Sequence, residues 1–560
     1  MNHVSRRRFL SVSAAGGAAV SLAAAGAGPA LADGSTGSSG SAAAGATTST
    51  STSTSSGLFG CPPAGAVTVT PTDPRYGYLT ARGANRRFTS TAATIHQVFT
   101  PQQVVAAVAQ EVAAGRQIAV RSGGHCLDAL VDVPAVQSVI DVSQMKDVYF
   151  DPTHQAFAVE SGAMLQDVYK QLLLGWGVVV PGGTCPTVGI GGYVQGGGFG
   201  SMTRQYGFCV DHLYGVEVVT VDAANNVQLV VATNDPADPN QDLWWAHTGA
   251  GGGNYGVVTR YLFRSPNATG TDPGTLLPAP PATNLVTTVA WPWSGLTQND
   301  FVTLVTNYGT WMAANSADGS PYASMFSALI LEQASAGACA MVCEIDGTLP
   351  NAADLMSSFV AAVNAGVSAP SKVTQVPMPW LDAQLAGLYG GSAGALNRNK
   401  GKGAYLRSPY TAAQATTLYT YLSSDTYSGL GALALFSFGC RANTVAPSAT
   451  ANPHRDSIML SYLATYWSDP TQDDQHIAWL RAFYTELYGT TGGVPAPGTG
   501  TDGSYINYPD VDLADPAQNT SGIPWSTIYF KDNYARLQAI KQRYDPQNLF
   551  RHPLSVQLPG

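Results

Sequence analysis

Charged side chains are scarce in this chain of 560 residues and make up only 11% of it. Those present are mostly acidic, with 36 Asp and Glu against 27 Lys and Arg, for a formal net charge of −9. A sparsely charged, acidic surface lacks the basic patches that bind nucleic acid or anionic membranes. The composition therefore argues against both kinds of partner and suits a soluble enzyme with an uncharged substrate.

Long, strongly hydrophobic runs are also missing, and an apolar stretch near the N-terminus is only weakly hydrophobic. It follows Arg6-Arg7-Arg8, is rich in Ala and Gly, and ends at Ala30-Leu31-Ala32. This pattern is typical of a cleaved twin-arginine signal peptide, residues 1–32, which directs folded proteins to the twin-arginine export machinery. The alternative is a membrane anchor, which the low hydrophobicity disfavours. We expect a secreted, extracellular protein without a stable membrane anchor.

Cysteine is sparse as well, at seven residues. Cys126 follows His125 directly, which raises the question of a metal site. No second group of His and Cys stands at a spacing that would complete a zinc site, so we expect no metal.

The chain is too long for a single hydrophobic core and predicts two domains. Residues 33–66 are rich in Ser, Thr, Gly and Ala, which predicts a flexible linker. A second stretch rich in Pro, Gly and Thr, 266–283, marks a boundary. We expect a first domain at 67–270, a second at 271–500 and a C-terminal segment at 501–560.

Short strands and helices are mixed in the first domain, which predicts an α+β fold. Thr100 and Pro101 are an N-cap and a first helical residue for a helix that ends near Gly115. Short apolar runs predict strands at 117–120, 139–142 and 156–159, and helical patterns cover 165–174 and 531–543.

Glycine is abundant, at 60 residues, and two Gly-rich turns each hold one nucleophilic side chain. They are Arg121-Ser122-Gly123-Gly124-His125 and Gly183-Thr184-Cys185-Pro186-Thr187-Val188-Gly189-Ile190-Gly191-Gly192. Without Cβ atoms, such turns let backbone N–H groups approach a phosphate or a flat ring. A lone His125 would more often be a buried, hydrogen-bonded histidine, and a lone Cys185 a core residue or half of a disulfide. Together they indicate one electrophilic cofactor that both can attack, and a flavin accepts both.

These turns resemble those of the berberine bridge enzyme family, within the vanillyl-alcohol oxidase/p-cresol methylhydroxylase flavoprotein fold. The resemblance runs from about Val67 to Pro559 and rests on the motifs RSGGH, GGTCPTVGIGGYVQGGGFG, LWWAHTGAGGGNYGVVT, YINYPD and YDPQNLFRHP. It implies a two-domain FAD-binding fold in which a helix-covered antiparallel sheet forms the substrate domain. It also implies that the C-terminal segment returns to the FAD domain, and that FAD is attached covalently through His125 and Cys185.

The segment Gly251–Gly256 matches the spacing GxGxxG but precedes an alternating run that predicts a strand. A Rossmann nucleotide site needs a helix there, so we reject that interpretation. The resemblance instead places this loop against the adenosine part of FAD. The FAD-binding residues that it implies are Arg121, Ser122, Gly123, Gly124, His125, Gly183, Thr184, Cys185, Thr187, Val188, Gly189, Gly191, Gly192, Gly196, Gly256, Val257, Val258 and Asn507.

The resemblance also assigns catalytic roles. Tyr508 is the base that takes the substrate's hydroxyl proton, and Tyr505 lines the substrate site. A free tyrosine has a pKa of about 10, so Tyr508 needs a nearby cation or hydrogen-bond donors, and Lys400 and Lys402 are the candidate cations. Val188 stands where the family controls oxygen access, and a small valine there is typical of oxidases that release H2O2.

With Cys185 bound to the flavin, an even number of cysteines remains, which permits disulfides outside the cell. The sequence does not indicate their pairing; the residues are Cys61, Cys126, Cys209, Cys339, Cys343 and Cys440. Phe199 and the segment Phe436–Cys440 depart from tyrosine-containing patterns of the family, which argues against a second, desaturating oxidation, but the sequence does not decide between one and two successive oxidations.

We expect a secreted FAD-dependent oxidase that acts on a hydroxyl of a sugar, an oligosaccharide or a glycosylated natural product, with O2 reduced to H2O2. An alternative is oxidation of a non-sugar alcohol, an amine or a C–H bond, including oxidative cyclisation in secondary metabolism. A flavin-carrying binding protein with a degraded site is a third, against which Tyr508 and Val188 argue. Nothing in the sequence distinguishes a monomer from a homo-oligomer.

Overall fold

The computed structural model describes residues 65–390 and 398–560. The predicted signal peptide, nearly all of the predicted linker, and Cys61 lie outside the described residues. Across the two described ranges, no helix is both long and apolar enough to cross a bilayer.

The first domain contains two sheets with one helix packed between them. In the four-stranded sheet the order is β1-β2-β4-β3, and β4 pairs in parallel with both β2 and β3. The five-stranded sheet is antiparallel, in the order β5-β6-β9-β7-β8. The strands are β1 (Val67–Val69), β2 (Thr94–Gln97), β3 (Ile118–Arg121), β4 (Ser138–Asp141), β5 (Val148–Asp151), β6 (Ala156–Glu160), β7 (Leu213–Val221), β8 (Val227–Thr233) and β9 (Val257–Phe263).

Helix α3 (Pro101–Ala113) shows how local sequence builds this domain. The Thr100 side chain accepts a hydrogen bond from the backbone N–H of Gln103, and Pro101 occupies the first turn, as predicted. Val104 and Val108 share a core with residues of both sheets, so α3 joins the sheets into one unit. The other helices are α2 (Tyr76–Thr80), α4 (Leu165–Trp176), α5 (Ile190–Gln195), α6 (Thr203–Tyr206) and α7 (Gln241–Ala246).

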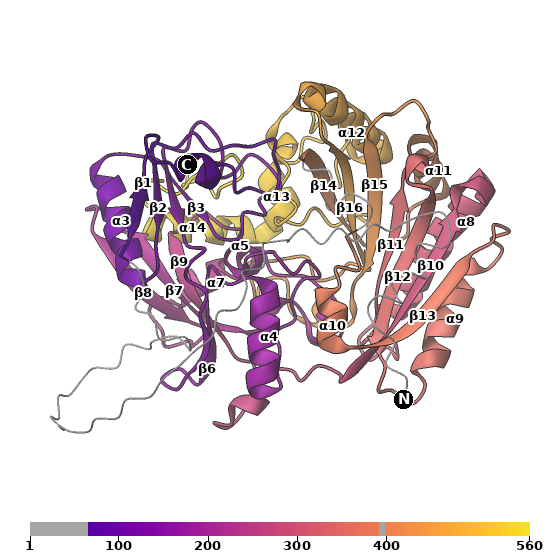
Figure 1. Ribbon diagram of the computed structural model, residues 1–560, viewed down its shortest axis with the longest axis horizontal. Coiled ribbons are helices and arrows are strands. Elements are labelled where there is room, and N and C mark those ends of the chain that lie inside the picture. The colour runs from indigo at the N-terminus through magenta and orange to yellow at the C-terminus, as the bar shows by residue number, and fades with distance from the viewer. Residues whose placement is uncertain (1–64, 391–397) are drawn as a thin grey trace, which may run out of the picture.

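The second domain is built on a seven-stranded antiparallel sheet in the order β13-β10-β12-β11-β15-β16-β14. Helices α8, α9, α11 and α12 cover one face, and the other face is turned toward the first domain (Figure 1). The elements are β10 (Thr283–Pro292), α8 (Gln298–Asn315), β11 (Phe326–Glu332), β12 (Ala338–Asp346), α9 (Ala352–Asn364), β13 (Lys372–Pro379), α10 (Trp380–Leu385), β14 (Arg398–Leu406), α11 (Ala412–Leu422), β15 (Leu430–Ser437), β16 (Met459–Trp467) and α12 (Asp473–Leu487).

Successive side chains along these strands point to opposite faces, so the sheet separates two large hydrophobic cores. On β11, Leu329 and Leu331 pack under the helices, whereas Ala328 and Ile330 join a core that continues into the first domain. Both faces of the sheet are therefore apolar, and the first domain covers one of them. A common core thus fixes the second domain to the first.

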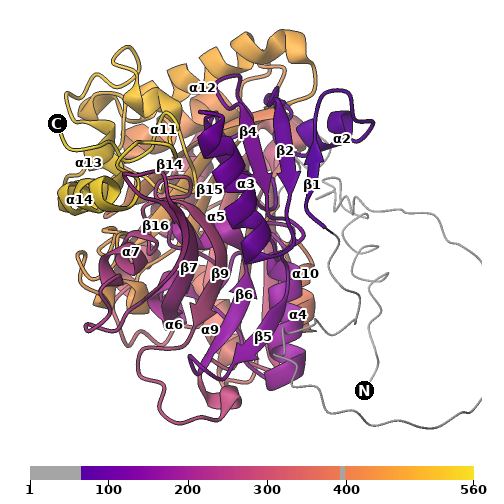
Figure 2. The same ribbon diagram turned by 90° about the vertical axis from the view of Figure 1, so that its left-hand side faces the viewer.

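The C-terminal segment carries α13 (Trp525–Phe530) and α14 (Tyr534–Tyr544) and packs beside α7 of the first domain (Figure 2). The buried Lys541 donates to the backbone oxygen of Asn254 at 2.7 Å, and the Tyr255 hydroxyl donates to the backbone oxygen of Leu537. The tail therefore braces the Gly251–Gly256 loop, and β9 follows that loop where a strand is predicted.

Candidate active site

One cavity of about 490 Å³ lies where the two domains meet. Both Gly-rich turns, the Gly251–Gly253 loop, the open face of the seven-stranded sheet and the segment Tyr505–Pro509 line it. The two turns and the YINYPD motif, which the sequence places far apart, therefore form a single site.

The two Gly-rich turns are in backbone contact. A Cβ on Gly123 would stand 2.4 Å from the nitrogen of Gly189, and one on Gly124 would meet the Arg82 oxygen at 2.9 Å. Gly124 also has φ +79°, which disfavours any side chain. These glycines are needed so that His125 and Cys185 can face the same space.

Arg121 lies at the start of the first turn but is only 2% exposed. Its guanidinium pairs with Asp132 at 3.2 Å and with Asp141 at 3.1 Å. Both partners are carboxylates, so the charge of Arg121 is balanced within the protein. Its side chain anchors the turn to β4, and it is the backbone around Arg121 that can serve a cofactor.

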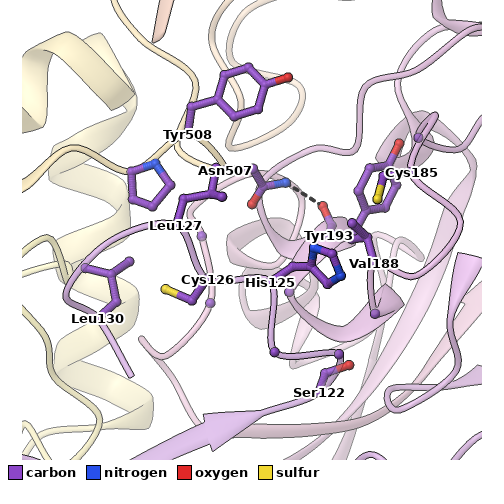
Figure 3. A pocket seen from close by; sticks show the side chains of 18 of the residues that line it. Ser122, His125, Cys126, Leu127, Leu130, Cys185, Val188, Tyr193, Asn507 and Tyr508 are labelled. Atoms are coloured by element: carbon purple, nitrogen blue, oxygen red, sulfur yellow. Dashed lines mark hydrogen bonds between the residues drawn. The ribbon is translucent and has the colours of Figure 1, made fainter. Parts of the chain in front are cut away.

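His125 and Cys185 converge on one hydroxyl group. Thr187 Oγ1 lies 3.1 Å from His125 Nε2 and 3.7 Å from Cys185 Sγ. Burial lowers the pKa of His125, which keeps the imidazole neutral and a ring nitrogen available as a nucleophile. Figure 3 shows both side chains at the same cavity, with Val188 between their segments.

The cavity has the features that a flavin dinucleotide requires. A Cβ on Gly192 would meet nothing within 4 Å, so this turn faces open space in which a flat group can lie on backbone. Of the predicted FAD-binding residues only Thr187, Gly196 and Val257 are outside the lining. Gly196 acts indirectly, because a Cβ there would stand 2.2 Å from Asn507 Oδ1.

Tyr505 is held firmly against the turn that follows α5. Its hydroxyl oxygen accepts hydrogen bonds from the backbone N–H groups of Gly198 and Phe199 and from Asn507 Nδ2, at 3.1, 3.3 and 3.0 Å. Asn507 Nδ2 also donates to the Tyr193 oxygen at 2.8 Å, as the dashed line in Figure 3 shows. Asn507 therefore contributes to the site by orienting Tyr505.

Tyr508 faces the cavity between two other tyrosine rings. Its ring centroid lies 4.3 Å from that of Tyr462 and 5.2 Å from that of Tyr505. Its hydroxyl forms no hydrogen bond with any residue that the structure describes, and burial raises its pKa. The hydroxyl is thus available to a substrate, but the apolar surroundings oppose its ionisation.

The suggestion that Lys400 or Lys402 serves as the cation beside Tyr508 is wrong. Lys400 Nζ contacts Asp128 at 2.6 Å and Asp510 at 2.7 Å, and Lys402 Nζ contacts Asp510 and Asp512, each at 2.7 Å. Each ammonium group is thus neutralised by two carboxylates. The sequence could not show this, because Asp128 is far away along the chain.

The open face of the sheet forms a shallow trough that sequence reasoning missed. Glu332 on β11 pairs in register with Ala432, which pairs with Ala464, which pairs with Gly401 on β14. Glu332, Ala432 and Ala464 line the cavity. The small side chains of Ala432 and Ala464 leave space in this row, and Tyr462 and Tyr466 on the neighbouring rows of β16 flank it. The Tyr462 hydroxyl covers Gly401, where a Cβ would stand 2.1 Å from it.

An aromatic cluster borders the same cavity on another side. The Phe199 ring centroid lies 5.7 Å from Phe326, 5.8 Å from Phe436 and 5.7 Å from Phe438. Phe199 and Phe436 line the cavity, so the two departures from the family pattern form one apolar wall.

The described cysteines carry no disulfide and no metal site. All six of those outside residues 1–64 are free, and five of them are wholly or largely buried away from solvent. No group of three or more His, Cys, Asp or Glu within the described residues is arranged to hold a metal ion. Burial raises the pKa of the Cys126 thiol to about 12, so this neighbour of His125 stays protonated.

Comparison with known proteins matches this arrangement. The model of the family "Berberine and berberine like" matches residues 504–557, and that of the "FAD binding domain" matches 92–224. The chain is 51% identical over 494 residues to an aclacinomycin-N/aclacinomycin-A oxidase of Streptomyces galilaeus, covering 88% of this chain and 90% of that one. The chain belongs to the berberine bridge enzyme-like family of FAD-linked oxidoreductases.

Solved structures agree with that assignment. A crystal structure of aclacinomycin oxidoreductase is 50% identical with a TM-score of 0.87, and covers 89% of this chain and all of the other. A glycopeptide hexose oxidase complexed with teicoplanin is 43% identical with a TM-score of 0.84, at the same coverage. The protein is thus an FAD-dependent oxidoreductase with the predicted two-domain fold of the vanillyl-alcohol oxidase type.

Proposed function

We propose that the protein is an exported oxidase that holds FAD through both His125 and Cys185 and oxidises a hydroxyl of a sugar, an oligosaccharide or a glycosylated natural product. Supporting this proposal, both nucleophiles, Tyr508 and the trough line one cavity. The names of the relatives, an aclacinomycin oxidase and a glycopeptide hexose oxidase, also support a glycosylated substrate. The twin-arginine pattern supports export after folding and cofactor loading.

The positions of the two side chains support the proposed double attachment. His125 Nε2 and Cys185 Sγ are both within reach of the Thr187 hydroxyl, so one planar ring placed there would contact both. Attachment prevents loss of the cofactor outside the cell, and it keeps the ring in place in a site wide enough for a bulky glycoside. The neutral imidazole offers a free ring nitrogen for attachment, and the Cys185 sulfur is exposed, so it can lose its proton to solvent and attack as the thiolate.

The residues around the substrate carry out the remaining steps of alcohol oxidation. Bound FAD would supply the redox chemistry: it would take up the hydride of the carbinol carbon and return its two electrons, with two protons, to O2 as H2O2. Tyr508 accepts the hydroxyl proton as the carbonyl forms, and Tyr505 with Asn507 fixes the adjacent wall. The trough accommodates the sugar that carries the hydroxyl.

A direct test of attachment is the visible spectrum of acid-precipitated protein, together with mass spectrometry of flavinyl peptides. We expect yellow precipitate and one flavin that joins the peptides of His125 and Cys185. His125→Ala or Cys185→Ala alone should leave flavin on a single link and slow turnover. Colourless precipitate from yellow native protein would overturn the covalent part of the proposal.

The substrate class is tested by a peroxide-coupled screen of free sugars, oligosaccharides and glycosylated natural products beside non-sugar alcohols and amines. Peroxide with any of the sugars, oligosaccharides or glycosylated products, and none with the non-sugar alcohols and amines, supports the proposal. Turnover of the other group instead favours the second candidate, oxidation of a non-sugar alcohol, an amine or a C–H bond, which the apolar wall of Phe199 and Phe436 could also accommodate.

A further inference from the structure

Lys400 lies at a junction of three parts of the molecule. It belongs to β14 of the second domain, and its side chain is only 2% exposed. Its Nζ contacts Asp128 Oδ2 at 2.6 Å and Asp510 Oδ1 at 2.7 Å. One ammonium group thus joins a strand, the loop of the first domain and the C-terminal segment.

The two carboxylates stand next to the residues with proposed chemical roles. Asp128 follows His125 in the same loop, separated only by Cys126 and Leu127, and Asp510 follows Tyr508 after Pro509. Figure 3 shows Leu127 on the chain segment near Tyr508. The bridge through Lys400 therefore connects the loop that carries His125 to the segment that carries Tyr508.

A second contact strengthens the same junction. The backbone N–H of Val511 donates to Asp128 Oδ2 at 3.0 Å, so the carboxylate that binds Lys400 also binds the C-terminal backbone. Buried carboxylates and ammonium groups are costly to leave unpaired, which makes this geometry stiff. A misplacement of about 1 Å in a reacting group can lower a rate about a hundredfold.

We propose that Lys400 is a positioning residue that sets the placement of Tyr508 relative to His125, and so relative to the cofactor that His125 holds. Lys400 touches neither substrate nor cofactor and acts through Asp128 and Asp510. This inference about Lys400 rests on the proposed function. Turnover and flavin retention of the wild-type enzyme, measured in parallel, test that function separately from the role of Lys400.

Lys402 offers a matched control. It lies on the same strand, is equally buried and contacts Asp510 and Asp512, but it makes no contact with Asp128. Lys400→Met and Lys402→Met each remove one positive charge from the same cluster, and only the first removes the ion pair with Asp128, while the hydrogen bond from Val511 to Asp128 remains in both. A difference between the two variants therefore measures the bridge rather than the charge.

The holoenzymes are compared by kcat, by KM and by the share of flavin that stays on His125 in a Cys185→Ala background. Lys400→Met should lower kcat at least about tenfold with KM changed less than about threefold, and should lower attachment at His125. Lys402→Met should retain attachment and lose less than about threefold in kcat. Equal losses in both variants would overturn the proposal.

A double variant separates position from charge. Asp128→Asn with Lys400→Met restores the charge balance of the cluster without restoring the bridge, so kcat should stay low; recovery to the level of Lys402→Met would overturn the proposal. Lys400→Arg serves if Lys400→Met does not fold, because it keeps the charge and moves the donor atoms. It should lower kcat more than Lys402→Met does, and wild-type turnover in Lys400→Arg would equally overturn the proposal.

Discussion

Thr187 shows how much of this site depends on a single atom. Its hydroxyl is the only group in the described structure that forms a hydrogen bond with His125, and the same oxygen faces Cys185. The hydroxyl can donate to Nε2 or accept from it, so Thr187 holds the imidazole ring in place in either tautomer.

We therefore predict that Thr187→Val lowers the share of flavin attached at His125, because the imidazole loses the hydrogen-bond partner that holds its ring in place. The measurement is flavin fluorescence of denatured protein in a Cys185→Ala background, in which only the histidine link can remain. Thr187→Ser keeps the hydroxyl and should attach flavin as the parent does. Equal attachment in the valine and serine variants would contradict this role.

The pH dependence of the reaction should follow Tyr508. Burial raises the pKa of this tyrosine, and a base acts only when deprotonated, so kcat/KM should rise with pH above neutrality rather than fall. Tyr508→Phe should keep the flavin, lose about a hundredfold or more in kcat and lose most of that rise. Steady-state rates across pH 6 to about 10 test this, and an unchanged profile in Tyr508→Phe would remove Tyr508 as the base.

At the residue scale, residues within motifs were placed in the site correctly more often than isolated residues were. His125, Cys185, Tyr505 and Tyr508 all line the cavity, because each stands in a turn whose glycines or neighbours require it there. The partners of Arg121, Lys400 and Lys402 could not be predicted, because ion pairs join residues that are far apart in sequence.

At the scale of elements, the trough across β11, β15 and β16 lines the cavity where the proposed function puts the substrate. We predict that Ala464→Phe fills the row between Tyr462 and Tyr466 and raises KM at least about tenfold, while the flavin stays attached. Ala464→Ser, which hardly changes the volume, should behave like wild type. Steady-state kinetics with a glycosylated substrate measure both, and an unchanged KM in Ala464→Phe would place the substrate elsewhere.

Where the local sequence signal is strong, the ends of helices and strands were predicted to within a few residues. The helix after Thr100, the strand before the RSGGH turn and the strand after Gly256 are all confirmed. The trough was not predicted, since it depends on register: β14 pairs with β16, and β11 pairs with β15, across long stretches of chain. Only the paired sheet brings Ala432 and Ala464 into one row.

At the scale of the molecule, buried carboxylates tie the C-terminal segment to the second domain. Burial opposes the charge of Asp502, but hydrogen bonds and charges of His454 and Lys531 outweigh it and hold the pKa well below its usual range. Asp512 behaves alike, because Arg481, Lys402 and Lys400 outweigh its burial. Both carboxylates favour the folded state while they are charged.

The stability of the protein should therefore fall on the acid side. A carboxylate with a lowered folded pKa contributes fully above the unfolded value of about 3.9 and loses that contribution as pH falls below it. We expect the thermal unfolding midpoint to drop as the pH is taken from about 5 toward 3. Asp502→Asn should lower the midpoint at pH 7 and flatten the acid decline, and a midpoint that is constant down to pH 3 would contradict the linkage.

The core shared between the seven-stranded sheet and the first domain has a mechanical consequence. Ile330, Phe436 and Leu460 from the sheet pack in one apolar body with Ile190 and Val194 from the flavin-binding half. Separating the halves would expose that body to water, so no hinge between them can open and close with each turnover. For the glycoside proposed above as substrate, this means entry end-first into a preformed cavity, with the bulk of a large molecule left in solvent while its terminal sugar reacts.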